Sequence, residues 1–543
     1  MTTNTLFYGD NLKVLRDHIP TASVDLVYLD PPFNSNRNYN VLFKEKSGEA
    51  SPAQIEVFTD TWEWDRVAEQ TFEDLVTDGP PNVAEMIGAM RSFVGSNDMM
   101  AYLVMMAVRL VELHRVLKPT GSLYLHCDPT ASHYLKILLD TIFGKEHFKN
   151  EIIWKRTTAH SSSKKYAPIH DTLLYYGRSA HVTWNELRSD YDEAYLAKYY
   201  RFHDGDDRLY WRADLTGAGT RKGPSGQPWR GFNPATIGRH WIASPETLDR
   251  YHAEGRIYYP QTGGMPQFKK YRDELKGKAV ADIWDDVDRI NPVGNERLGY
   301  PTQKPLALVE RIIAASSNPG DVVLDPFCGC GTAVVAAEKL GRHWIGIDVT
   351  HLAIALMRFR LNESFPGVQF AVKGEPTDVG GAQALAAADR YQFQWWALSL
   401  VHAKPVDGKE KKGADQGIDG AILFIDDASR SVKRCLVQVK SGHVNSATMR
   451  DLNGTIKREK AEMGILVTLE PPTGPMRKEA VQEGSYHSEA WNRDYPRVQI
   501  VTVEELLHGV RPDVPPTRST FSSASRISDP AATKSSQFDL FDL

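Results

Sequence analysis

The sequence predicts an α/β fold with a largely parallel sheet, in a chain of several domains. Short apolar runs alternate with helical stripes near the N-terminus and again from residue 301 to 348, a pattern typical of strand-helix-strand units. A length of 543 residues is too great for one compact core, so two to four domains are expected. The apolar fraction of 41% and the charged fraction of 24% are ordinary for a soluble globular protein and exclude a fibrous one.

The first part of the chain supplies the expected elements in close succession. Apolar residues at 103, 106, 107, 110, 113 and 117 recur with helical spacing, so one helix is expected over 101–117. Lys-Pro-Thr-Gly at 118–121 ends this helix, and the apolar run after it is expected as a strand. The expected elements are strands at 6–9, 25–30, 122–128, 151–156 and 171–177 and helices at 11–19, 101–117 and 133–144.

Residues 181–290 interrupt this alternation. They are polar, aromatic and rich in glycine without a sustained period, which predicts an inserted loop-rich domain or a binding surface. The strand and helix pattern returns at 301, and a third α/β block follows. The predicted boundaries are 1–180 and 296–365 for the two halves of the first domain, 181–295 for the insertion, 366–380 for a linker, 381–510 for the third block and 511–543 for a disordered tail.

Composition narrows the location and the partners of the chain. The start lacks a basic flank before an apolar run, and no apolar stretch approaches the roughly 20 residues of a membrane span, so a cytoplasmic protein is expected. Four cysteines are too few for a disulfide framework, and Cys-Gly-Cys is not a common zinc spacing, so reduced and packed cysteines are expected. The net charge of −5 argues against an overall polyanion-binding surface but leaves a local basic cluster open.

A glycine-rich loop marks one candidate binding site. Asp325 ends a predicted strand, Gly329 and Gly331 let the backbone pass close to a ligand, and Thr332 opens a helix whose amide end favours polar or anionic groups. Asp348 follows 19 residues after Gly329, at the end of the next strand, where an acid can bind the two ribose hydroxyls of a nucleoside. For these residues alone, a glycine turn with a chance acid remains an alternative.

The spacing of this loop differs from that of dinucleotide-binding folds. Phe327-x-Gly329-x-Gly331-Thr332 replaces the usual GxGxxG. With Asp325 in front, the pattern resembles the S-adenosylmethionine loop of amino-methylating DNA methyltransferases. The resemblance implies S-adenosyl-L-methionine as the cofactor.

The tetrapeptide Asp30-Pro31-Pro32-Phe33 follows a predicted buried strand. Two prolines stop a strand, which is the simplest reason for their presence. The pairing with the glycine loop favours methyl transfer to an exocyclic amine, whose lone pair is delocalised into the base. Acceptors on the amine hydrogens, the Asp30 carboxylate and the Pro31 carbonyl, restore the lone pair and stabilise the developing positive charge.

The remaining residues of this tetrapeptide suit a base that has left the duplex. Pro32 helps to keep the Pro31 carbonyl rigid, and Phe33 can stack on the base, a contact worth about 1–3 kcal/mol. An amine inside a duplex is unreachable, so the base must first be flipped out of the helix. Double-stranded DNA is therefore the expected substrate.

The order of these motifs resembles that of a β-group amino DNA methyltransferase. The segment around Gly9 and Asp10 comes first, then Asp-Pro-Pro-Phe, the irregular block, Thr-Gln-Lys-Pro and the glycine loop, over about residues 4–365. The resemblance implies a Rossmann-like S-adenosylmethionine-dependent methyltransferase fold with an inserted target-recognition region at 181–290. It implies that Asp10 lies by the adenine end of the cofactor and that Gln303, Lys304 and Pro305 close its methionine end.

Two alternatives to adenine methylation stay open. Asp30 resembles the adenine-methylating type more than the Ser-Pro-Pro cytosine type, but transfer to the exocyclic amine of cytosine remains an alternative. A protein that senses S-adenosylmethionine without reacting is the other alternative, disfavoured because the whole tetrapeptide is present.

A second candidate site lies in the third block. Asp419 lies early in one predicted strand, and Gln438 and Lys440 are two apart on another, so the last two share a face. Asp419 and Gln438 could hold Mg²⁺, and Lys440 could position the water that attacks a phosphodiester. A solvated hairpin with a chance lysine is the alternative for these three residues alone.

The wider stretch at 412–460 resembles the Mrr-like branch of PD-(D/E)xK endonucleases, in which Gln often replaces an acid. The resemblance implies a restriction-endonuclease-like α/β domain, with Asp415 as a helper, and hence a restriction-modification enzyme of bacterial or phage origin. A domain that only docks on DNA is the rival interpretation.

The C-terminus carries a third feature, Gln537-Phe538-Asp539-Leu540-Phe541-Asp542-Leu543. It resembles the short peptide by which bacterial proteins bind the replication sliding clamp. Leu540 and Phe541 would fill an apolar pocket, with the tail as a tether. The sequence leaves open whether the chain forms a homodimer.

Overall fold

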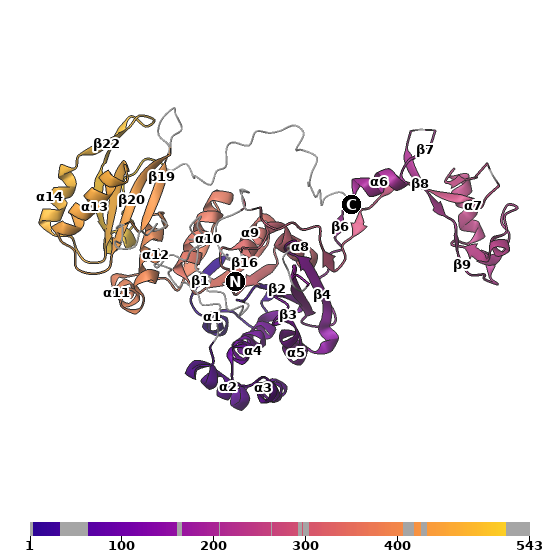
Figure 1. Ribbon diagram of the computed structural model, residues 1–543, viewed down its shortest axis with the longest axis horizontal. Helices are drawn as coiled ribbons and strands as arrows, with labels where there is room; N and C mark the ends of the chain where they lie inside the picture. Colours follow the sequence, from indigo (N-terminus) through magenta and orange to yellow (C-terminus); the bar gives the residue numbers. More distant parts are fainter. Residues whose placement is uncertain are drawn as a thin grey trace. The chain divides into compact units, whose positions relative to one another are not determined.

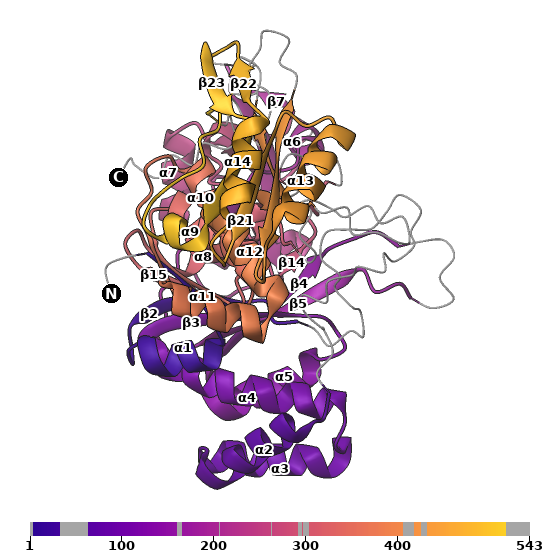
Figure 2. The same ribbon diagram turned by 90° about the vertical axis from the view of Figure 1, so that its left-hand side faces the viewer.

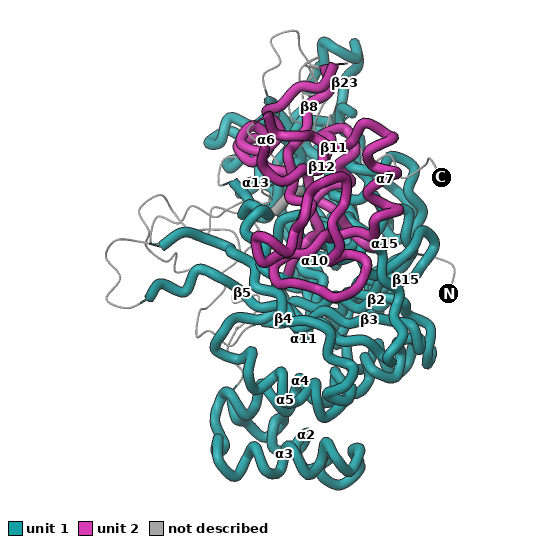
Figure 3. Tube along the Cα trace, turned by 90° about the vertical axis from the view of Figure 1, so that its right-hand side faces the viewer, with its two compact units in different colours: residues 1–185, 282–543 teal, residues 186–281 magenta. Residues whose placement is uncertain are grey.

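The computed structural model describes residues 4–32, 63–159, 166–205, 207–261, 263–291, 296, 303–405, 418–424 and 432–516. By contacts, the chain divides into two compact units (Figure 3). One unit comprises residues 1–185 and 282–543, and the other comprises residues 186–281. The second unit is thus inserted between two halves of the first.

A nine-stranded sheet forms the centre of the first domain, in the order β14-β4-β5-β3-β2-β15-β16-β1-β17 (Figure 1). Neighbouring strands are parallel except at β5, which runs antiparallel to both β3 and β4. The strands are β1 (Thr5–Tyr8), β2 (Val24–Leu29), β3 (Leu117–Cys127), β4 (Phe148–Lys155), β5 (His170–Gly177), β14 (Ile283–Trp284), β15 (Val322–Asp325), β16 (His343–Asp348) and β17 (Ala371–Lys373). The predicted α/β fold with a largely parallel sheet is confirmed.

Helices cover both faces of this sheet (Figure 2). On one face lie α1 (Asn11–His18), α4 (Asp98–Val116) and α5 (Ser132–Phe143), with the pair α2 (Arg66–Asp78) and α3 (Pro81–Val94) packed against α4 and α5. On the other face lie α8 (Leu306–Ser316), α9 (Thr332–Lys339) and α10 (His351–Ser364). The helix expected over 101–117 is confirmed, and it begins earlier because Asn97 caps it by accepting a hydrogen bond from Met100 N.

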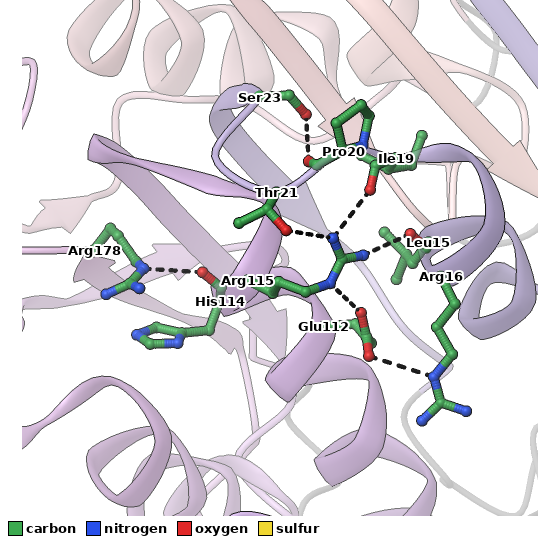
Figure 4. Close-up of polar contacts among 10 residues, drawn as sticks. All are labelled: Leu15, Arg16, Ile19, Pro20, Thr21, Ser23, Glu112, His114, Arg115 and Arg178. Atoms are coloured by element: carbon green, nitrogen blue, oxygen red, sulfur yellow. Dashed lines mark hydrogen bonds and ion pairs between the residues drawn. The ribbon is translucent and has the colours of Figure 1, made fainter.

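Arg115, near the end of α4, fixes the connection between α1 and β2 (Figure 4). Its guanidinium donates to the carbonyl oxygens of Leu15 at 2.7 Å and Ile19 at 3.2 Å, and to Thr21 Oγ1 at 3.1 Å. Glu112 accepts from its Nε at 2.6 Å and neutralises its charge. These bonds satisfy carbonyl groups that the end of α1 leaves free, so the entry into β2 is held firmly.

The inserted unit has its own small sheet and core. Its four-stranded antiparallel sheet has the order β11-β12-β8-β7, formed by β7 (Phe202–His203), β8 (Leu209–Asp214), β11 (Ile257–Tyr258) and β12 (Gln267–Tyr271). Beside it are the helices α6 (Glu193–Tyr199) and α7 (Pro245–Ala253) and the short strand pairs β6 (Arg188–Ser189) with β13 (Lys278–Ala279) and β9 (Thr216–Ala218) with β10 (Arg239–Trp241). Trp229, Trp241 and Leu248 lie in its buried core. Strands this short leave no sustained period in the sequence, which is why none was predicted.

The third block contains a five-stranded sheet in the order β18-β19-β20-β21-β24. Its strands are β18 (Lys404–Pro405), β19 (Gly420–Phe424), β20 (Lys433–Lys440), β21 (Met463–Thr468) and β24 (Val498–Thr502). Its helices are α11 (Val379–Ala388), α12 (Arg390–Leu400), α13 (Ser446–Arg458), α14 (Gly474–Gln482) and α15 (Val503–Leu507), and the hairpin of β22 (Ser485–Ser488) and β23 (Arg493–Pro496) completes it. Two clusters of buried apolar side chains lie on opposite faces of this sheet.

Two boundary predictions differ from the structure. The expected linker 366–380 contains β17, which pairs with β1 and forms the last strand of the first sheet. A three-residue strand is too short to give an alternating pattern. Residues 511–516, which were expected to belong to a disordered tail, lie on the third block, because Asp513 bonds to Arg493 and Gln499.

Among the described helices, none has the length and apolar character that a membrane crossing requires. The cysteines are all free and buried, as expected: Cys127, Cys328, Cys330 and Cys435.

Candidate active site

The topological switch of the first sheet lies between β2 and β15. These strands are parallel neighbours, with Leu26 beside Val323 and Val27 beside Leu324, and the chain leaves them towards opposite edges of the sheet. Asp30 follows the last residue of β2, and Asp325 is the last residue of β15. Ligands of open α/β sheets bind outside the carboxyl ends of strands at such a point, so both aspartates lie where a ligand is expected.

Lys304 connects the two motifs that the sequence pairs. Its Nζ lies 2.5 Å from Asp30 Oδ2, and its carbonyl oxygen accepts a hydrogen bond from Thr332 Oγ1 at 3.4 Å. The Lys304 side chain is 9% exposed and that of Asp30 is 15% exposed, so the ion pair is largely removed from solvent. Residues 274 positions apart are thus in direct contact, and Asp-Pro-Pro-Phe and the glycine loop border one site.

The glycine loop is held by the two acids that flank it. Asp325 Oδ1 accepts from Phe327 N at 3.0 Å, and Asp348 Oδ2 accepts from Gly329 N at 2.9 Å. Gly331 has φ +78°, and a Cβ there would lie 2.6 Å from Met357 Cγ, so only glycine suits this position. The loop therefore allows the backbone to pass close to a ligand at the carboxyl ends of the strands.

Asp10 adjoins the same edge from the neighbouring strand. Gly9 N donates to Asp348 O at 2.9 Å, which places the turn after β1 beside the end of β16. Asp10 caps α1 and pairs with the buried Arg109 at 2.8 Å, while 53% of its side chain stays exposed. Asn11 donates to Pro326 O at 2.8 Å and so ties α1 to the glycine loop.

The site holds more acidic than basic side chains. Burial raises the pKa of Asp325 well above its ordinary value, and the neighbouring Asp30 and Asp348 raise it further. Burial also raises the pKa of Asp348, although hydrogen bonds from Thr350 and Gly329 oppose the change. Clustered acids of this kind fit a ligand with a positive charge and hydroxyl donors, and they disfavour a phosphate.

The other predicted residues of this site differ in their surroundings. Pro31 and Pro305 are buried, Pro32 is half-buried, and Phe33 lies outside the described residues. Gln303 Nε2 donates to Glu296 O at 2.7 Å, and Pro305 precedes the first residue of α8. Residues 303–305, predicted to close the methionine end of the cofactor, thus lie directly before α8. Of these residues, Lys304 contacts Asp30 and so borders the site.

A buried chain of polar side chains, which was not predicted from the sequence, lies behind Asp30. Tyr28 Oη lies 3.2 Å from His126 Nδ1, and His126 Nε2 lies 3.1 Å from Asp171 Oδ2. Burial alone would raise the pKa of Asp171, but the bond from His126 and the nearby Lys304 and Arg156 hold it below its ordinary value. These residues lie on three strands far apart in sequence, so no local pattern could have shown their contact.

The candidate residues of the third block also lie close together. Asp419 precedes β19, whose Gly420 is opposite Val437, so Asp419 lies next to Gln438. Its Oδ2 accepts from Val439 N at 2.6 Å and its Oδ1 from Gln394 Nε2 at 2.8 Å. Gln438 Oε1 is buried without a hydrogen-bond partner in the described part of the chain.

No metal-binding cluster accompanies these residues within the described ranges. There, no group of three or more His, Cys, Asp or Glu side chains could hold a metal ion. Asp415 lies outside the described residues, as does the whole C-terminal peptide with Gln537, Leu540 and Phe541.

A doubly wound sheet with acids and a glycine loop at its switch point defines a nucleoside-binding α/β protein. Comparison with known families narrows this class. Residues 24–357 match the N6/N4 family model described as DNA methylase, which covers more than half of the chain. The chain belongs to this DNA methylase family, so the resemblance of the first domain to amino DNA methyltransferases is confirmed.

Curated relatives agree with the family. The type II methyltransferase M.EcaI of Enterobacter cloacae is 30% identical over 347 residues, 64% of this chain and 66% of its own length. The Mod subunit of the type III restriction-modification enzyme StyLTI of Salmonella typhimurium is 26% identical over 62% of this chain and 50% of its own length. The DNA adenine methyltransferase YhdJ of Escherichia coli is 26% identical over 66% of this chain and 82% of its own length. The matched part of the chain thus spans about two thirds of the length of M.EcaI and about one half of the length of the StyLTI Mod subunit.

Two further similarities are more limited. Residues 403–508 match a model described as NACHT-associated inactive Restriction Endonuclease 1, so the third block is restriction-endonuclease-like. Among solved structures, PvuII DNA methyltransferase (cytosine-N4-specific) aligns with 68% of this chain and 95% of its own at 12% identity. Its TM-score of 0.33 supports no argument about this chain.

Proposed function

We propose that the chain transfers a methyl group from S-adenosyl-L-methionine to the exocyclic amine of adenine in double-stranded DNA. The observation that carries the proposal is the contact of Lys304 with both Asp30 and Thr332, which joins the amine-binding and cofactor-binding motifs in one site. The surplus of carboxylates supports a cationic cofactor. Adenine is favoured by the acid at position 30 and by the E. coli relative named a DNA adenine methyltransferase.

The residues of the chain suit this reaction. When bound, S-adenosylmethionine supplies a methyl group on a positively charged sulfur. Asp10 and Asp348 would accept from its hydroxyl and amine groups, and the glycine loop would allow its close approach. The Asp30 carboxylate and Pro31 carbonyl accept the two amine hydrogens and orient the nitrogen lone pair. Transfer would form a nitrogen-carbon bond as the carbon-sulfur bond of the cofactor breaks, and the amine would lose one proton through the Asp30 carboxylate to solvent.

Lys304 takes the position of an amine donor when no base is bound. Its Nζ contacts the carboxylate that the adenine amine would contact, so an incoming base has to displace it from Asp30 Oδ2. Until then the pair keeps a partly buried carboxylate from being left uncompensated. The flipped base would then complete a site that is already organised.

Product analysis tests this proposal directly. The purified chain is incubated with mixed-sequence duplex DNA and methyl-labelled S-adenosylmethionine, and the DNA is digested to nucleosides. Label in N6-methyladenine supports the proposal, while label in N4-methylcytosine supports the cytosine alternative. DNA that stays unlabelled although the cofactor binds would refute methyl transfer and favour a cofactor sensor.

For the third block, our proposal is DNA docking without cleavage. Both oxygens of Asp419 are hydrogen-bonded to amides, and its neighbour Gln438 is a neutral side chain. The matched family model is one described as inactive, which also supports this reading. A Mg²⁺-dependent Mrr-like nuclease is the second candidate, because Asp419, Gln438 and Lys440 lie at neighbouring positions of one sheet.

Cleavage of unmodified DNA separates the two candidates. The chain and its Lys440→Ala variant are compared in Mg²⁺ with Ca²⁺ and chelator as controls. Intact DNA with both proteins supports docking alone. Strand breaks that require Mg²⁺ and disappear in the variant would establish the nuclease and, with methylation, a restriction-modification enzyme.

A further inference from the structure

The inserted unit has a composition that the rest of the chain lacks. From residue 186 to 281, 15 of 96 residues are aromatic, against 10% in the whole chain. The same segment has 16 Lys and Arg against 13 Asp and Glu, a formal charge of +3, whereas the whole chain carries −5. Cations interleaved with aromatic rings are the usual composition of a nucleic-acid-binding surface.

Arg212 on β8 stands out among these cations. Its guanidinium carbon lies 3.6 Å from the centroid of the Phe202 ring on β7 and 3.7 Å from that of Tyr258 on β11. The two rings come from different strands of the same sheet, so three elements of the fold hold one side chain. Such cation-aromatic contacts fix the position of the guanidinium.

Arg212 lacks the counter-charge that a half-buried arginine usually has. Its Nε is buried without a hydrogen-bond partner, and no ion pair to it is found in the described part of the chain. A buried N–H donor without an acceptor costs free energy, so the fold holds Nε of this arginine at an energetic disadvantage. Two rings lie beside the guanidinium and Nε is buried. The terminal Nη groups are therefore the part of Arg212 that can donate hydrogen bonds to a ligand.

Arg208, a few residues before, provides the contrast. Its guanidinium also lies on a ring, 3.9 Å from the centroid of Tyr271. However, its Nε and Nη2 donate to the two oxygens of Asp273 at 2.9 Å each, and Nη2 also reaches Glu274 at 3.2 Å. The fork of Arg208 is therefore used within the fold, and that of Arg212 is not.

We infer that Arg212 reads a guanine in the DNA target through its Nη groups. This inference rests on the proposed DNA methyltransferase function and adds to it a specificity-determining residue. Guanine presents two acceptors, O6 and N7, on its major-groove edge, and a planar arginine fork donates to both at once. A phosphate also accepts from both arms of an arginine fork, but such a contact carries no base preference, so selection for a base distinguishes the two.

The inference is tested by selection of bound duplexes, which requires no turnover. The full chain, its Arg212→Lys variant and its Arg208→Lys variant each select from a pool of duplexes with randomised sequence, and the bound fraction is sequenced. Lysine keeps the charge but loses the planar fork. Arg212→Lys is expected to lower the preference for guanine at one position by about tenfold or more, with the preferences at other positions and the affinity for unrelated sequences little changed.

Replacement of that guanine by 7-deazaguanine sharpens the result. It removes the N7 acceptor and is expected to weaken binding of the unaltered chain but not of Arg212→Lys. Arg208→Lys should keep the full preference, and thermal unfolding checks that all three proteins are folded.

An unchanged preference in Arg212→Lys, or an equal loss of affinity for all sequences, would overturn the inference, the second result pointing to a phosphate contact. Guanine selection without any methylation of the selected DNA would count against the proposed function while leaving the role of Arg212 supported.

Discussion

The strand ends of the first domain and of the third block both place an aspartate near a lysine, but they use the aspartate differently. Asp30 contacts the charged Nζ of Lys304, beside a glycine loop and two further acids. The Asp419 carboxylate accepts hydrogen bonds from two neutral amides, Gln394 Nε2 and Val439 N. In the proposed reaction a substrate amine would displace the partner of Asp30, whereas Asp419 is bonded to amide groups of its own fold.

Because the two aspartates have different hydrogen-bond partners, residue type alone does not define a reactive site. An ion pair at a switch point leaves an acceptor that becomes available when the lysine moves. Backbone and amide donors that complete a strand end do not leave without local unfolding. The predictions below test whether the two aspartates differ in this way.

Loss of the Asp30 carboxylate is expected to have the largest effect. Asp30→Ala removes one of the two acceptors for the amine, so the methylation rate should fall by about 10²–10³-fold while the cofactor still binds. Single-turnover rates with labelled cofactor and calorimetric cofactor binding measure the two effects. Asp419→Ala is the matched control and should methylate normally. Normal turnover by Asp30→Ala would end the comparison between the two sites.

The two lysines should differ in stability. Lys304→Met leaves Asp30 and Asp325 without their nearby cation in a largely buried site, which is expected to cost about 3 kcal/mol of unfolding free energy. Lys440→Met breaks no ion pair found among the described residues and should cost less than about 1 kcal/mol. Urea unfolding followed by tryptophan fluorescence measures both. Equal costs would mean that the Lys304 pair is no tighter than a surface contact.

Much of the first domain follows from its sequence, and the reasons are local. The stripe of apolar residues in α4, the strand before Asp30 and the loop from Asp325 to Thr332 each carry a pattern within a few residues. The reversal of β5 was not predicted, because β4 and β5 follow each other without a helix and pair as a hairpin. Nor was the helix pair α2 and α3.

The partners of the reactive residues could not be predicted in the same way. Lys304 was assigned to the cofactor by resemblance, while the structure adds its contact with Asp30, 274 positions away. The chain from Tyr28 through His126 to Asp171 depends on the strand order of the sheet. In the third block, the Mg²⁺ role predicted for Asp419 and Gln438 stays a prediction, and nothing in the sequence indicated that Gln394 on α12 bonds to Asp419.

The loops after the two strand ends give a smaller contrast. Gly331→Ala forces a non-glycine residue to φ +78° and brings its Cβ within 2.6 Å of Met357 Cγ, a strain of about 1–2 kcal/mol before the clash. We expect cofactor affinity to fall by about tenfold, as measured by calorimetry. Gly442→Ala, after β20, meets nothing within 4 Å and is the control. A cofactor affinity equal to that of the unaltered chain would show that the loop tolerates a side chain.

The smallest expected effect concerns pH and a residue outside both sites. Burial, with Arg178 and His147 nearby, lowers the pKa of His114 to about 4. The unfolded chain binds this proton at about pH 6.5 and the folded chain does not, so stability falls as the pH drops from 6.5 towards 4. His114→Gln should make the melting temperature of the first domain less dependent on pH over this range, while substitution of the exposed His133 should not. If the melting temperature of His114→Gln depends on pH as that of the unaltered chain does, the loss of stability in acid would be assigned to the carboxylates of the site. This variant is therefore the baseline against which pH effects on Asp325 and Asp348 are interpreted.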